Sequence, residues 1–143
     1  MSSDAPVSRP TLSDSAATAV LDAALETAKA MGERVTIVIV DEGGNPKALR
    51  RMDGAPLVSI QTAQNKAYAA AAIGMPGDEF FDAIKEDAAA VASFASRPGL
   101  ALIAGGMPLG IAGSVVGGVG VAGARTGIED RRIAEAALRG LTA

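Results

Sequence analysis

The chain has 143 residues, about the length of one ordinary domain, and 49% of them are apolar, which argues against a disordered protein. A net charge of −3 argues against a nucleic-acid partner, because nucleic-acid-binding proteins normally carry a basic face. The sequence contains neither Cys nor His, so disulfides, thiolate metal sites and the commonest protein ligand of haem iron are excluded.

The N-terminal segment is polar and contains two prolines, which predicts a disordered lead at residues 1–10 before a single domain at residues 11–143. This segment lacks the pattern of a signal peptide, so we expect a cytoplasmic protein. Thr11 and Asp14 form a capping-box pattern that predicts a helix from Leu12 to about Met31.

A hairpin and two helices are expected in the middle of the chain. The β-branched run 35–41 predicts a strand buried on both faces, and a turn leads back into a second strand at 47–52. Apolar residues at helical spacing predict a helix at 57–73. A further helix is expected from Asp78 to the Arg97-Pro98-Gly99 stop.

The last third predicts extended segments at 100–104, 107–112 and 115–122, and then a helix to Leu141 that starts with the capping box Thr126 to Glu129. The order is α-β-β-α-α-β-β-α. Because the strands come in hairpin pairs, we expect an α/β (α+β) fold whose sheet is mainly antiparallel and flanked by helices.

The glycine-rich stretch between Arg97 and Arg125 carries no charge and is long enough to cross a membrane. Its nine glycines and two prolines favour buried strands with tight turns instead, so we expect no membrane partner. Residues 118–123 match the G-x-G-x-x-G pattern of dinucleotide sites, but they lie inside a predicted strand. A strand to which other segments pack closely is the better interpretation.

Two groups of candidate residues lie before and within the second predicted helix. Ser59, Thr62 and Lys66 form one polar line, which either borders a cleft or is a solvated flank. Lys66 could bind an anion, act as a base or form a Schiff base. At the end of the second strand, Arg51 and Asp53 could reach a site, or Asp53 could stabilise the turn.

Three further candidates remain. Arg125 and Thr126 precede the last helix, where free N–H groups and a guanidinium could hold a carboxylate, or where a capped helix could simply follow a solvated Arg. Tyr68, the only tyrosine, could ligate haem iron or serve as a packing residue. The five methionines are typical core filler.

Several motifs together resemble the GlcG/HbpS-like, or haem-degrading, family. They are Asp41-x-Gly43-Gly44, Arg51-Met52-Asp53-Gly54, Lys66-Ala67, Gly105-Gly106-Met107-Pro108, Gly118-Val119-Gly120-Val121-Ala122-Gly123 and Asp130. The resemblance implies a profilin-like α/β/α architecture with a five-stranded antiparallel sheet, and assembly into dimers and higher oligomers up to octamers. Family members are linked to haem binding and degradation, although the absence of His argues against haem as a cofactor here.

Three hypotheses follow. The first is an oligomeric protein that binds a small anionic ligand, haem being one candidate, with the anion held by Arg51, Lys66, Arg125 and Thr126 and any iron ligand supplied by Tyr68 or a methionine. The alternative is a lyase, isomerase or hydrolase acting on a small organic acid, with Lys66, Asp53 and Asp130 as acid–base residues. The residues leave open whether the protein is an enzyme, and a structural subunit without a ligand is a third hypothesis.

Overall fold

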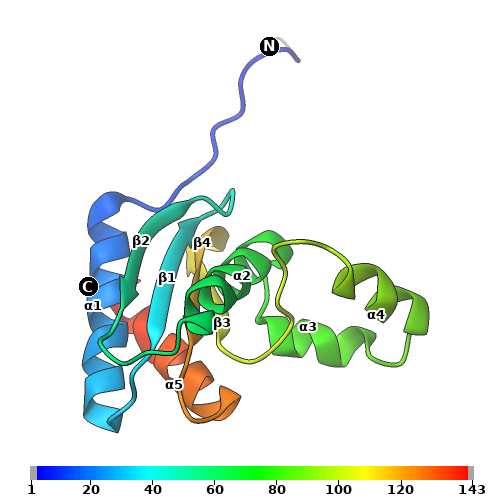
Figure 1. The fold of residues 1–143 in the computed structure, drawn as a ribbon. Helices are drawn as coiled ribbons and strands as arrows, with labels where there is room; N and C mark the ends of the chain where they lie inside the picture. The colour runs from blue at the N-terminus through cyan, green and yellow to red at the C-terminus, as the bar shows by residue number, and fades with distance from the viewer. Residues whose placement is uncertain (1–2, 142–143) are drawn as a thin grey trace.

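The computed structural model describes residues 3–141 and shows a sheet with helices on both faces (Figure 1). The elements in chain order are α1 (Asp14–Met31), β1 (Thr36–Asp41), β2 (Pro46–Arg51), α2 (Val58–Ile73), α3 (Gly77–Ile84), α4 (Ala88–Ala95), β3 (Gly106–Ile111), β4 (Ser114–Ala122), α5 (Gly127–Ala137) and the 3-10 turn η1 (Leu138–Leu141).

The strands lie in the order β2-β1-β4-β3, and every neighbouring pair is antiparallel, as the hairpin pattern predicts. The sheet of the described residues has four strands, so the prediction of a fifth strand, at 100–104, is wrong. Leu100, Leu102 and Ile103 instead face apolar side chains of α3 and α4, with which they line one small hollow. Their apolarity serves contact with these helices rather than strand pairing.

Alternate residues of β1 supply the two faces of the sheet, because successive strand side chains point in opposite directions. Ile37 and Ile39 pack with α1 and α5 in the larger core, whereas Val38 and Val40 pack with α2 in the smaller one. Both faces of β1 are therefore buried, as its continuous β-branched run predicts.

The smaller core is thin because α2 lies directly on two glycines of β4. A Cβ atom at Gly118 would collide with the carbonyl oxygen of Ala67, and one at Gly120 with that of Ala63. These glycines belong to the G-x-G-x-x-G match, which thus permits a helix to approach the strand rather than a phosphate to bind.

The region expected as one helix between Asp78 and Arg97 is two helices, α3 and α4, that form an arm extending away from the sheet (Figure 1). The break falls at Lys85–Asp87, where Asp87 accepts a hydrogen bond from the backbone N–H of Ala90 and so caps α4. The three residues at this break, Lys85, Glu86 and Asp87, are all charged, so the apolar pattern of α3 does not continue through them.

The start of α1 also differs from expectation. Ser13 is the N-cap and accepts a hydrogen bond from the N–H of Ala16, whereas Thr11 donates its hydroxyl hydrogen to Glu42 in the β1–β2 turn. The preceding residues 3–10 are exposed and contain no helix or strand. Among the helices of residues 3–141, none combines the length and apolarity needed to cross a membrane.

The contact between α2 and β4 gives a first prediction. Gly120→Ala places a methyl group against the backbone of α2, so we expect a loss of about 3 kcal/mol or more in the free energy of unfolding. Urea denaturation measures this loss. Gly110→Ala is the matched control, because a Cβ there meets only ordinary contact with Ser114, and an equal loss in both variants would contradict the close approach.

Candidate functional site

A buried ion pair links α2 to α5, and one of its members also bonds to β4. The Nζ atom of Lys66 on α2 lies 3.1 Å from Oδ2 of Asp130 on α5 and donates a hydrogen bond of 2.9 Å to the carbonyl oxygen of Val121 on β4. The other carboxylate oxygen of Asp130 accepts from the N–H of Ala124 at 3.0 Å. Sequence reasoning named both charged residues as candidates, and the structure brings them together.

Two glycines at the start of β3 cover this pair. A Cβ at Gly105 would lie 2.8 Å from the Nζ atom of Lys66, and one at Gly106 would lie 2.5 Å from its carbonyl oxygen. Gly105 also has a φ of 120°, a conformation that side chains disfavour. The Gly-Gly motif therefore lets the backbone close over Lys66 and keep water out.

Burial dominates the ionisation of the pair. Desolvation lowers the pKa of Lys66 and raises the pKa of Asp130, while the attraction between the two groups opposes each shift. Only 2% of Lys66 and 6% of Asp130 are exposed, so neither group reaches solvent. The pair fits a structural junction better than a base or nucleophile that meets a ligand.

The polar line on α2 is neither a solvated flank nor the border of a cleft. Ser59 is buried and shares a hydrogen bond of 2.8 Å with Thr36 on β1, and Lys66 is buried as described. Thr62 donates to the carbonyl oxygen of Val58 within its own helix. Ser59 and Lys66 thus face the interior, whereas Thr62 is half-buried and bonds only within α2.

Arg125 and Thr126 both have partners within the chain. The Nε atom of Arg125 lies 2.7 Å from Oε1 of the buried Glu33, whose other oxygen accepts from the N–H of Arg125. Thr126 is the N-cap of α5, as predicted: its Oγ1 accepts from the N–H of Ile128, and its hydroxyl donates to Glu129 in place of the reciprocal backbone bonds of a capping box. The guanidinium of Arg125 remains largely exposed, with its side chain 77% accessible.

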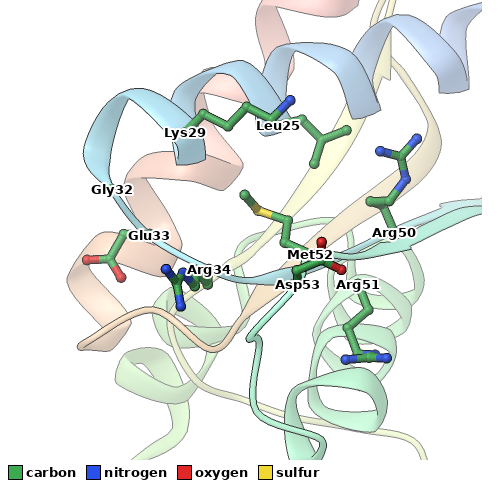
Figure 2. Close-up of a pocket in the computed structure, with 9 residues that line it drawn as sticks. All are labelled: Leu25, Lys29, Gly32, Glu33, Arg34, Arg50, Arg51, Met52 and Asp53. Carbon is green, nitrogen blue, oxygen red and sulfur yellow. The ribbon is translucent and has the colours of Figure 1, made fainter.

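An open hollow of about 520 Å³ lies where the end of α1 meets the end of β2 (Figure 2). Its lining residues are Leu25, Lys29, Gly32, Glu33, Arg34, Arg50, Arg51, Met52 and Asp53. We call it the basic hollow, because four of these residues are cations in a chain whose net charge is −3. Of its two carboxylates, that of Glu33 is already paired with Arg125.

The two adjacent arginines of β2 lie on opposite faces of the sheet. Arg50 pairs in register with Ile37, which faces α1, whereas Arg51 pairs with Thr36, which bonds to Ser59 of α2. Figure 2 shows Arg50 and Lys29 on the same side as the sulfur of Met52, and Arg51 pointing away from them. Arg50 is therefore better placed in the basic hollow than Arg51.

Tyr68 lies apart from both sites. It is on the outward side of α2, where it lines two small hollows with the 97–100 loop. Arg51 and Asp53 share the basic hollow, Lys66 and Asp130 share the buried junction, and Arg125 contacts the hollow through Glu33. The candidates of the sequence thus fall into three places rather than one.

The sequence analysis did not single out four charged residues of the hollow: Lys29, Glu33, Arg34 and Arg50. The sequence did contain a signal for Arg50: side chains alternate along a strand, so if Arg51 lies on one face of β2, its neighbour Arg50 lies on the other. Glu33 and Arg34 follow Gly32, whose left-handed φ of 70° ends α1 and turns the chain into the hollow. Their convergence with β2 depends on tertiary packing.

The buried junction gives a second prediction. Lys66→Met leaves Asp130 buried without its partner, so we expect a loss of about 3–5 kcal/mol in the free energy of unfolding near neutral pH. The loss should shrink toward about pH 4, near the pKa of Asp in an unfolded chain. Burial raises the pKa of Asp130 above that value, so between the two pKa values the folded protein still binds a proton that the unfolded chain has lost. The free energy of unfolding therefore falls as the pH rises through this range.

Urea denaturation at both ends of this pH range measures the effect. The control is the double variant Lys66→Met/Asp130→Asn, which carries no charge at the junction and whose loss should not change with pH in this way. A loss in Lys66→Met that is the same at both pH values would show that Asp130 does not become an unpaired buried charge.

Comparison with known proteins shows which family this chain resembles. Residues 12–139 match the family described as haem-degrading protein HbpS-like. An uncharacterised 15.0 kDa protein from the dhaT–dhaS intergenic region of Citrobacter freundii is 36% identical over 114 residues, which cover 78% of this chain and 80% of that protein.

Two solved structures are similar along nearly the whole chain. A double mutant of Streptomyces reticuli HbpS is 33% identical with a TM-score of 0.87, covering 99% of this chain and 93% of the other. PduOC, solved in complex with heme, is 28% identical with a TM-score of 0.82, covering 91% and 94%. The profilin-like expectation agrees with these neighbours, and the chain belongs to the HbpS-like haem-degrading family.

Proposed function

We propose that this protein associates with copies of itself and binds a small organic anion with more than one carboxylate in the basic hollow. Haem, through its two propionates, is the member of this class that we favour. The observation that carries the proposal is that Lys29, Arg34 and Arg50 line the same hollow as Met52 (Figure 2).

The size and chemistry of the hollow support this proposal. Its volume of about 520 Å³ lies within the range of about 300–1,000 Å³ typical of small-molecule sites. Guanidinium groups match carboxylates with two parallel hydrogen bonds, and Leu25 and Met52 add apolar contact. None of the four cations has an ion pair with another described residue, so their charges stay available for a ligand.

The lining residues fit haem without a histidine. Arg50, Arg34 and Lys29 would hold the propionates, and the thioether of Met52, a known type of haem ligand, would face the iron. When bound, haem would supply an iron centre for redox or oxygen chemistry. The relative PduOC, whose fold this chain shares, has been solved with heme, and this supports haem as the ligand here.

Self-association is supported by the α3–α4 arm. All residues of α4 except one serine are apolar, yet none of them is buried, and α3 buries only Gly77. Phe81 and Ile103 are 39% and 54% exposed beside the apolar hollow between α3, α4 and the 100–103 segment. A second copy would cover this surface, as the small-residue core of a chain with 3% aromatics also favours.

The enzyme alternative remains a hypothesis without such an observation. Lys66 and Asp130 are buried and line none of the hollows described above. Asp53 does line the basic hollow, but it stands there beside cations rather than beside a second acid–base group that is free to act.

A third prediction tests the basic hollow. Protoporphyrin IX, which has both propionates but no iron, should bind Arg50→Gln roughly 10- to 100-fold more weakly than the parent chain, because a charge-assisted hydrogen bond is lost. Arg132→Gln is the matched control, since the same change at an exposed position of α5 outside the hollow should leave affinity nearly unchanged. Porphyrin fluorescence measures the binding.

Haemin separates the role of iron from that of the propionates. Met52→Leu nearly keeps the volume of the side chain but removes the sulfur. It should therefore weaken the binding of haemin and shift the Soret band of bound haemin, while the binding of protoporphyrin IX stays unchanged. If haemin gives no saturable Soret change in the parent chain, haem is not the ligand. Equal losses in Arg50→Gln and Arg132→Gln would show that the basic hollow is not the site.

A fourth prediction concerns self-association. Ile103→Glu places a charge on the apolar surface of the arm, so sedimentation equilibrium should show a lower average mass than for the parent chain. Leu57→Glu is the control, because Leu57 is an exposed aliphatic residue at the start of α2, at the opposite end of that helix from the arm. A monomeric parent chain, or an equal decrease in both variants, would refute the arm as the contact surface.

A further inference from the structure

A second candidate binding site lies on the outward side of α2, apart from the residues of the basic hollow. Two adjacent hollows of about 190 and 210 Å³ share Tyr68 and Pro98 as lining residues. The first continues over Gln61, Gln64 and Asn65, and the second over Ile73, Phe94 and Leu100, with Arg97 also in its lining. Figure 1 shows the chain after α4 returning alongside α2, where it forms the facing wall.

The walls of this groove, which we call the Tyr68 groove, are aromatic and held in place. Gly44 leaves room for the edge of the Tyr68 ring, because any Cβ there would collide with it, and Gly99 approaches the opposite edge. The ring of Phe94 packs edge-to-face on Phe80 at 5.1 Å between centroids. Flat walls fixed in this way suit a flat ligand.

Polar groups lie at each end of the groove, and several of them have no hydrogen bond or ion pair with another residue of 3–141. The guanidinium of Arg97 lies 4.9 Å over the ring of Phe94 and forms no ion pair with any residue of the described chain. At the other end, Gln61 donates to Asn65 at 2.9 Å. Within residues 3–141, neither the amide of Gln64 nor the hydroxyl of Tyr68 forms a hydrogen bond.

We propose that the Tyr68 groove binds a planar aromatic carboxylate whose ring lies against Tyr68 and Pro98, with its carboxylate on Arg97. A hydrogen-bonding substituent on the far side of the ring would meet Gln64 and Asn65. Each hollow alone is smaller than the roughly 300 Å³ at which ligand sites begin, so the ligand must extend across both. This site is independent of the anion site in the basic hollow.

The chain contains its own reporter for this site. Tyr68 is the only tyrosine and there is no tryptophan, so tyrosine emission comes from the groove alone. Titration with 6-hydroxy-2-naphthoate, after correction for its absorbance, should quench this emission to saturation. Cyclohexanecarboxylate carries the same charge without a planar ring and should bind at least roughly tenfold more weakly, because it cannot stack on the ring of Tyr68.

Variants assign the contacts. Arg97→Gln should weaken naphthoate binding roughly tenfold or more, since it removes the carboxylate's partner, whereas Arg132→Gln, the same change at an exposed site on α5, should leave it unchanged. Ala72→Glu places a repelling carboxylate at an exposed position of the groove and serves as a second block. Arg50→Gln should not affect naphthoate, which separates this site from the basic hollow.

Two results would overturn the proposal. One is the absence of saturable quenching in the parent chain. The other is quenching that survives unchanged in both Arg97→Gln and Ala72→Glu, with circular dichroism showing that the variants are folded. If instead Arg50→Gln alone abolishes naphthoate binding, the ligand occupies the basic hollow and the Tyr68 groove is not its site.

Discussion

The direct contact of α2 with the glycines of β4 is the constraint on which the rest of the structure depends. Because Gly118 and Gly120 have no side chains, the backbone of α2 rests on the strand at Ala63 and Ala67. That approach brings Lys66, which precedes Ala67 on the helix, to the carbonyl of Val121 and the carboxylate of Asp130. A larger residue in the strand would lift the helix and leave two buried charges apart, at a large cost in stability.

The same contact separates structure from binding. The inner side of α2 contacts the sheet and contributes to the ion pair. The surfaces left for ligands are therefore the outer side of α2 and the basic hollow at the end of β2. The motif residues by which the chain resembles its family, Lys66, Gly105 and Asp130 among them, meet at the buried junction rather than in an open pocket. Likeness in these motifs therefore reflects a shared architecture more directly than a shared ligand.

Local patterns were sufficient to predict most of the fold. The β-branched strand β1, the hairpins and the helix start at Thr126 each depend on neighbours in sequence, and each is confirmed. Expectation failed where distant segments decide the outcome: residues 100–103 pack on the arm instead of pairing, and Lys66 is buried by glycines about 40 residues further along the chain. The site residues were individually named, but their division among three places follows from packing that no local pattern encodes.

The opposed faces of Arg50 and Arg51 have a consequence for how such a protein can diverge. The β1–β2 pairing contains an irregularity between Ile39 and Val40, close to the turn, so the hairpin already tolerates a local change of register. A single inserted or deleted residue in β2 would exchange the two arginines across the sheet, since side chains alternate with period two. Relatives with the same net charge could thereby present an arginine on the other face of the sheet. A change in the length of one hairpin would then alter which ligand is bound, without any substitution at the site.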